Sequence, residues 1–192
     1  MSDELAGKRI AFLVANVGVE LVELTRPWQA VKDAGGEPVL LAPEKAPILT
    51  VNHDSEPAGS VDPDHAVGDV WAEDFAALVL PGGVANPDKL RQVPEAVAFA
   101  AAIAAFGKPV AAICHGPWTL IDAGVVAGKS LTSWPSLQTD IRNAGGDWQD
   151  EPVLVCSAMG FDLVTSRKPA DLDAFNAQLV RTFARTSICG LD

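Results

Sequence analysis

Short, unbroken apolar segments alternate with segments of helical length along most of this 192-residue chain. An apolar segment without alternating polar positions is typical of a strand that is buried on both faces. Strands that are separated by helices of ten or more residues favour crossover connections between parallel neighbours. The sequence therefore predicts an α/β fold with a mainly parallel sheet and helices on both faces of that sheet.

The boundaries of these segments follow from the apolar runs and from the Gly and Pro residues between them. The expected strands are 8–15, 37–43, 76–83, 109–114 and 130–134, followed by a β pair at 152–158 and 161–167. The expected helices are 18–36, 86–108, 116–128, 136–146 and 171–184. We expect one domain over residues 1–192, because a chain of this length favours a single core.

The chain is acidic, with 25 Asp and Glu residues against 14 Lys and Arg residues and a formal net charge of −11. This charge repels phosphate backbones and anionic lipids, so neither nucleic acid nor a membrane is an expected partner. Three cysteines, an odd number, do not form a disulfide framework, and the polar N-terminus lacks the apolar segment of a secretory signal. These features predict a cytoplasmic protein with reduced thiols.

Residues 44–74 break the regular pattern. They are rich in Asp, Glu, Pro and Gly, and they contain His53 and His65. Histidines and carboxylates are common metal ligands, but their spacing here matches no metal motif. We therefore expect a solvated, irregular acidic insertion and no metal site. The tail at 186–192, which contains Cys189, is expected to be frayed.

The segment PVAAICHGPWTLIDAG, at 109–124, places a cysteine where an apolar strand gives way to a helix. Reactive groups of parallel sheets lie at the carboxyl ends of strands, where a sharp turn exposes its central residue. Gly116 gives this turn its backbone freedom, and Pro117 suits the first turn of a helix. The amide groups of that helix would lower the pKa of the Cys114 thiol and hold a developing oxyanion. Cys114 is therefore the candidate nucleophile, whereas Cys156, inside an apolar strand, is expected to serve packing.

A nucleophilic cysteine needs a neighbouring group to manage its proton. His115 is adjacent in sequence, although adjacent side chains at a sharp turn usually diverge. Glu20 and Glu23 follow the first strand three residues apart, which places them on one helix face at the same sheet edge as Cys114. Asp88, which follows the PGG turn of the third strand, comes from that edge too. One of these carboxyl groups could reach the sulfur atom.

Two tryptophans are candidates for the walls of a pocket around Cys114. Trp118 directly follows the turn, and Trp134 lies just beyond the carboxyl end of a strand. Packing between helix and sheet explains Trp118 equally well, whereas the position of Trp134 favours a pocket wall.

Four segments, AICHGPWTLIDAGVVAGK, LVLPGG, GVELVELTRP and LVTSRKPADLDAFNAQLV, together resemble the ThiJ/PfpI superfamily, in its PfpI-like intracellular protease and general stress protein branch. The resemblance extends from Lys8 to about Ala184, and its AICHGP run is highly specific. It implies a flavodoxin-like three-layer sandwich related to the class I glutamine amidotransferase fold. It also implies a homodimer or a larger homo-oligomer. No cofactor is expected, and the chain contains neither a G-x-G-x-x-G fingerprint nor a P-loop.

The resemblance also implies roles for individual residues. The reactive cysteine of the family corresponds to Cys114, its following histidine to His115, and the glutamate that hydrogen-bonds the sulfur to Glu23. An ionised carboxyl group beside the sulfur raises the pKa of the thiol, whereas a protonated one donates a hydrogen bond to the thiolate and lowers that pKa. The same carboxyl group could then move protons during attack on a carbonyl.

The turn at Gly82 and Gly83 matches the backbone donors that the family places beside its cysteine, together with the amide of His115. In protease-like members, a further acid lent by the neighbouring subunit follows this turn. Asp88 is the nearest match, but it is shorter than the usual glutamate and follows a loop that is one residue longer. This departure weakens the expectation of a Cys–His–acid triad.

Three functions are consistent with these residues. In the first, Cys114 attacks a small reactive carbonyl such as methylglyoxal or its protein adducts, as a glyoxalase, a deglycase or a related thiol hydrolase. In the second, the chain is a cysteine peptidase whose triad is completed across a subunit interface. In the third, the protein is a non-enzymatic sensor of oxidative stress, in which Cys114 is oxidised to a sulfenic or sulfinic acid. The sequence favours a stress-protection protein that acts through the first chemistry.

Overall fold

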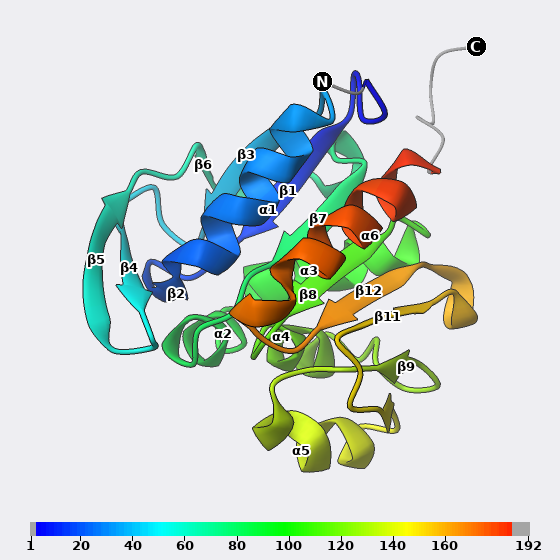
Figure 1. Ribbon diagram of the computed structural model, residues 1–192. Helices are drawn as coiled ribbons and strands as arrows, with labels where there is room; N and C mark the ends of the chain where they lie inside the picture. Colours follow the sequence, from blue (N-terminus) through cyan, green and yellow to red (C-terminus); the bar gives the residue numbers. More distant parts are fainter. Residues whose placement is uncertain (1–2, 186–192) are drawn as a thin grey trace.

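The computed structural model describes residues 3–185, so the predicted frayed tail at 186–192 lies outside the described residues. Its centre is a seven-stranded sheet (Figure 1). From edge to edge the strands are β11 (Val153–Cys156), β12 (Leu163–Ser166), β8 (Val110–Ile113), β7 (Ala77–Leu80), β1 (Arg9–Leu13), β3 (Glu37–Ala42) and β6 (His65–Ala66). Neighbours pair in parallel except β11 and β12, which form the predicted antiparallel pair. The predicted mainly parallel α/β sheet is therefore confirmed.

Helices cover both faces of this sheet, as Figure 1 shows. On one face lie α1 (Leu21–Asp33) and α6 (Leu172–Ala184); on the other lie α3 (Pro94–Ala105) and α4 (Pro117–Asp122). Strand β1 shows why both faces are apolar, because alternate residues enter different cores. Ile10 and Phe12 pack with α1 and α6, whereas Ala11 and Leu13 pack with α3 and α4. These two cores make the molecule the expected three-layer sandwich.

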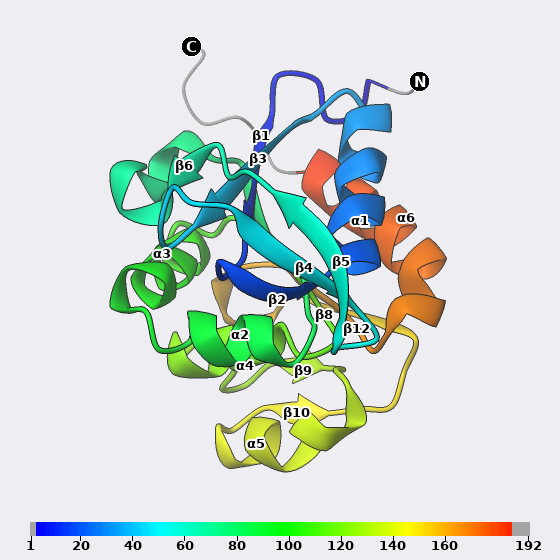
Figure 2. The same cartoon turned by 90° about the vertical axis from the view of Figure 1, so that its left-hand side faces the viewer.

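A second, three-stranded sheet stands beside the carboxyl ends of the central strands (Figure 2). It consists of β2 (Val17–Glu20), β4 (Ile48–Asn52) and β5 (Glu56–Val61). The prediction of an irregular insertion at 44–74 was therefore wrong, because most of this segment forms the β4–β5 hairpin and β6. Strand β5 is largely exposed and polar, so it lacks the apolar pattern on which the prediction depended.

Several element boundaries also differ from the prediction. The helix expected at 18–36 begins only at Leu21, because the preceding residues pair with β4. The segment 86–108 forms two helices, α2 (Ala85–Leu90) and α3, because Pro94 starts a new helix. The strand expected at 130–134 is limited to β9 (Ser130–Leu131), which pairs with β10 (Asp147–Trp148), and between them lies α5 (Gln138–Asn143). Within residues 3–185, no helix has the length and apolarity needed to cross a membrane.

Candidate active site

Cys114 occupies the sharp turn between β8 and α4. Its backbone φ of 60° lies in the left-handed region, which is unusual for a residue with a side chain and costs conformational energy. The turn is held by the amide of Cys114, which donates to the Ser166 carbonyl at 3.0 Å, and by the amide of Trp134, which donates to the Cys114 carbonyl at 2.8 Å. Gly116 is required for this close packing, because a β-carbon there would lie 2.5 Å from the Leu80 carbonyl oxygen.

Glu23 approaches the sulfur from the first turn of α1 and is fully buried. One carboxyl oxygen, Oε2, accepts a hydrogen bond of 2.9 Å from the amide of Gly82. The other, Oε1, is buried without a partner of normal hydrogen-bond geometry among the described residues. Burial raises the pKa of Glu23 to about 8, and the charges of Glu20 and Asp54 act in the same direction. The carboxyl group therefore retains its proton at neutral pH.

The environment of the Cys114 thiol differs from the prediction. The turn into α4 is present, but the pKa of the thiol is raised above its ordinary value, first by burial and then by repulsion from an ionised Glu23. Hydrogen bonds from the backbone amides of Gly83 and His115 oppose this shift. Burial therefore disfavours the thiolate, and ionisation of Glu23 disfavours it further.

His115 contacts Cys114, contrary to the expectation that the two side chains diverge. Its Nδ1 lies 3.2 Å from the Cys114 Sγ, and its Nε2 lies 3.4 Å from the hydroxyl oxygen of Ser136. The imidazole is held between Trp118 and Trp134, with ring-centre distances of 5.2 and 5.7 Å. Burial lowers its pKa, so the neutral ring is favoured and can accept a proton. The left-handed backbone of Cys114 explains how adjacent side chains meet.

A small cavity of about 110 Å³ opens onto the sulfur atom. It is lined by Glu20, Glu23, His53, Asp54, Cys114, Trp134 and Pro169. Trp134 therefore forms a wall of this pocket, as expected. Trp118 is not among the lining residues; it packs behind His115 and donates from its indole nitrogen to Asp140 at 2.9 Å.

Two aspartates differ in their position relative to the pocket. Asp88 is exposed on α2 and does not line the pocket. Asp54, which sequence reasoning missed, reaches the pocket from the β4–β5 turn. Its carboxylate accepts a hydrogen bond of 2.9 Å from the amide of Val84. The NHD sequence of this turn, at 52–54, is a signal for left-handed backbone, but it does not indicate which part of the molecule the turn covers.

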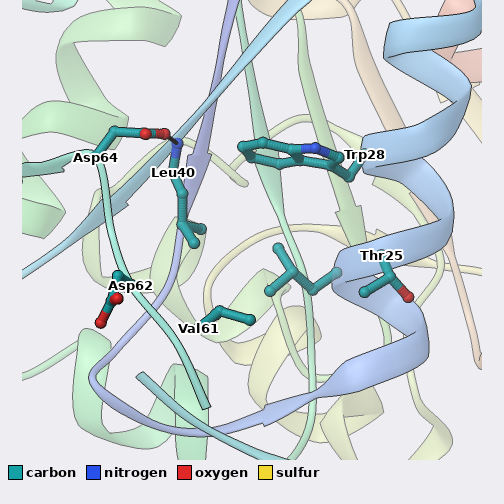
Figure 3. Close-up of a pocket in the computed structure, with 7 residues that line it drawn as sticks. Thr25, Trp28, Leu40, Val61, Asp62 and Asp64 are labelled. Atoms are coloured by element: carbon teal, nitrogen blue, oxygen red, sulfur yellow. Dashed lines mark hydrogen bonds between the residues drawn. The ribbon is translucent and has the colours of Figure 1, made fainter. Parts of the chain in front are cut away.

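A larger cavity of about 230 Å³ lies between α1 and the end of β5 (Figure 3). Its walls are Leu24, Thr25, Trp28, Leu40, Val61, Asp62 and Asp64. The Asp64 carboxylate accepts a hydrogen bond of 2.7 Å from the Leu40 amide. The lining residues include no thiol and no imidazole, so the smaller pocket at Cys114 is the candidate active site. No group of three His, Cys, Asp or Glu side chains suited to hold a metal occurs within residues 3–185.

Comparison with known proteins agrees with this geometry. A family model described as the DJ-1/PfpI family matches residues 8–182. The chain belongs to the DJ-1/PfpI family. General stress protein 18 of Bacillus subtilis is 40% identical over 172 residues, which cover 90% of this chain and 95% of that protein. The deglycase PYRAB04690 of Pyrococcus abyssi is 42% identical over 162 residues, which cover 84% of this chain and 92% of that protein.

The fold of this DJ-1/PfpI protein also matches solved structures. The crystal structure of Drosophila melanogaster DJ-1beta superimposes with a TM-score of 0.80 at 25% sequence identity. The match covers 96% of this chain and 91% of that chain. The three-layer architecture is therefore that of the family.

Position 82 in this DJ-1/PfpI site has no room for a side chain. The backbone role of Gly82 also differs from the prediction. Its amide donates to Glu23, so the amides that face the sulfur are those of Gly83 and His115. A β-carbon at position 82 would lie 2.5 Å from the Glu23 carboxyl oxygen Oε2 and 2.6 Å from the Cys114 β-carbon.

We expect Gly82→Ala to displace both side chains and to lower the free energy of unfolding by roughly 1–3 kcal/mol, as other overpacking substitutions do. Urea unfolding measures this loss. Gly68→Ala is the matched control, because a β-carbon there meets no atom within 4 Å. Equal stability of the two variants would contradict the steric role of Gly82.

Proposed function

We propose that the chain is a cysteine-dependent enzyme that converts small reactive carbonyls, of the glyoxalase or deglycase type, and thereby protects the cell under stress. The contact of 3.2 Å between the Cys114 Sγ and the His115 Nδ1, beside a carboxyl group that retains its proton, supports this proposal. The names of the stress-protein and deglycase relatives support it as well.

The size of the pocket favours small substrates. Its volume of about 110 Å³ is well below the roughly 300–1,000 Å³ typical of sites for drug-sized ligands. A three-carbon dicarbonyl, or the end of a glycated side chain, is the kind of group that such a pocket accommodates. A peptide backbone bound on both sides of a scissile bond needs a longer groove, so peptidase activity is the weaker hypothesis.

The mechanism follows from the groups around the sulfur. His115 accepts the thiol proton, and the thiolate attacks the aldehyde carbon of methylglyoxal, forming a C–S bond. The electron pair of the carbonyl moves to oxygen, which takes the proton of Glu23 and gives a hemithioacetal. The Glu23 carboxylate then removes the hydrogen from the former aldehyde carbon; the electron pair of that C–H bond forms a C=C bond, and the former ketone oxygen takes the proton held by His115, which gives an enediol. Glu23 returns its proton to the former ketone carbon and takes the proton of the hydroxyl group on the sulfur-bearing carbon, which leaves a thioester. Water cleaves the resulting thioester, releasing lactate and restoring the thiol.

No electrons enter or leave this cycle, because one carbon is oxidised while its neighbour is reduced. The proposed chemistry therefore requires no cofactor. We further propose that the protein acts in the cytoplasm as a homodimer or a larger homo-oligomer, on free carbonyls or on protein adducts. Exposure of Asp88 on α2 is compatible with contact to a neighbouring subunit.

The test is the conversion of methylglyoxal to lactate at neutral pH. We expect Cys114→Ser to lower kcat/KM at least 100-fold, because the hydroxyl is a far weaker nucleophile than the thiolate. Cys156→Ser, which alters a cysteine in β11 outside the pocket, serves as the matched control.

The products also separate the alternatives. If the wild type forms no lactate but peroxide converts Cys114 to a sulfinic acid, the sensor hypothesis replaces the enzyme hypothesis. Lactate formation that survives Cys114→Ser would show that another site carries the reaction.

A further inference from the structure

The turn of the β4–β5 hairpin lines the Cys114 pocket and is hydrogen-bonded to β2 and to the start of α2. His53 and Asp54 both adopt left-handed backbone conformations, with φ of 52° and 64°. Their amides donate to the two carboxylate oxygens of Glu20, each at 3.1 Å. Glu20 itself is only 6% exposed at the end of β2. Two consecutive left-handed residues are costly, so their conformation is maintained by this buried carboxylate.

The Asp54 side chain is fixed as well as its backbone. Its Oδ1 accepts the hydrogen bond from the Val84 amide, which ties the hairpin to the start of α2. The carboxylate lines the pocket that contains the nucleophile, and its charge acts on Cys114, Glu23 and His115. A bound substrate therefore meets a negative charge that is restrained from turning away.

No Lys or Arg side chain in the pocket wall compensates this charge. The lining residues include three carboxyl groups, from Glu20, Glu23 and Asp54, and no Lys or Arg. The pocket volume of about 110 Å³ leaves a substrate little room to avoid Asp54. Asp54 is itself an exposed residue, so solvent screens part of its charge. Two unit charges about 6 Å apart, at an effective dielectric constant of about 40, repel strongly enough to weaken binding roughly 10-fold.

We propose that Asp54 determines substrate specificity by charge: the pocket admits uncharged carbonyl compounds and rejects anionic ones such as 2-oxo acids. The identity of the reacting carbonyl rests on the proposed function. The charge selection itself applies to any electrophile that reaches Cys114.

The first experiment therefore uses alkylation, which does not require turnover. Iodoacetamide and iodoacetate have the same leaving group and nearly the same shape, but only iodoacetate is an anion. The rate ratio is the alkylation rate with iodoacetamide divided by the alkylation rate with iodoacetate, each followed by mass spectrometry at neutral pH. We expect this ratio at Cys114 to exceed the ratio for free glutathione at least 10-fold. Asp54→Asn, which retains an acceptor for the Val84 amide, should reduce the ratio at Cys114 about 10-fold. A change in the thiol pKa affects both reagents equally and cancels.

Glu56→Gln provides the matched control, because it removes one negative charge from the same hairpin at an exposed position outside the pocket. Its ratio should equal that of the wild type. An unchanged ratio in Asp54→Asn, or an equal change in Glu56→Gln, would overturn the proposal.

The second experiment compares 4,5-dioxopentanoate with its methyl ester, two 2-oxo aldehydes that can both undergo the proposed reaction and of which only the first is an anion. Asp54→Asn should raise kcat/KM for the anion relative to the ester about 10-fold. If the alkylation ratio shifts but neither compound is turned over, the charge selection stands and the proposed function fails. If both compounds are turned over at a relative rate that Asp54→Asn leaves unchanged, the specificity proposal fails and the enzyme remains.

Discussion

Glu23→Gln is expected to raise the free energy of unfolding at pH 8 by about 4 kcal/mol, because burial raises the pKa of Glu23 to about 8 whereas the unfolded chain has a value near 4.5. Between these values the folded protein binds a proton that the unfolded chain has lost. Stability of the wild type therefore falls as the pH rises through this range. Glutamine does not titrate, and its side-chain carbonyl can still accept a hydrogen bond from the Gly82 amide. The stability of the variant therefore does not fall with pH for this reason.

Urea unfolding at pH 4.5, 6, 7 and 8 measures the effect. The difference in the free energy of unfolding between Glu23→Gln and the wild type should be small at pH 4.5. It should grow with each pH step and reach on the order of 3 kcal/mol at pH 7. Glu56→Gln is exposed and should follow the wild-type curve at every pH. Parallel curves for Glu23→Gln and the wild type would show that this carboxyl group is already ionised at neutral pH.

Lys129→Met is expected to lower the free energy of unfolding by about 3 kcal/mol or more, because buried acceptors without donors each cost roughly 1–3 kcal/mol. The Lys129 ammonium is fully buried and lies 3.5 Å from the centre of the Phe161 ring. It donates to the carbonyl oxygens of Cys156, Ala158 and Phe161, all in or beside the connection between β11 and β12. Methionine fills similar space but donates no hydrogen bond.

The control is Lys168→Met, which makes the same substitution at an exposed lysine. The midpoint of urea unfolding should fall for Lys129→Met and remain near the wild-type value for Lys168→Met. A loss below 0.5 kcal/mol, on the order of an ordinary surface substitution, would mean that water replaces the ammonium at these carbonyls.

The central sheet was predictable because its strands are apolar on both faces and because the segments between the strands are long enough to form helices. The place of Cys114 at a strand-to-helix turn was predictable for a related reason, since it follows such a strand and Pro117 starts a helix. Glu23 followed from the family resemblance, and its burial agrees with a role beside the sulfur.

The β4–β5 hairpin was not predictable in the same way. Its outer strand is exposed, contains Pro57 and Gly59, and therefore lacks both periodic and continuous apolar character. The place of Asp54 depends on contacts with Glu20 and Val84, which are about 30 residues away in either direction. Ser136 was missed because its contact with His115 depends on how the chain returns past α4. Such contacts arise from tertiary packing and leave no local pattern.

The division of the pocket between two sheets has an evolutionary consequence. The central sheet supplies the sulfur through β8, whereas the small sheet supplies Asp54 through a surface hairpin. Loops and hairpins tolerate exchange far better than buried strands do. Under the charge selection proposed for Asp54, descendants of this protein would acquire a new preference among electrophiles by altering residues of this one hairpin, while Cys114 and the core that positions it are inherited unchanged.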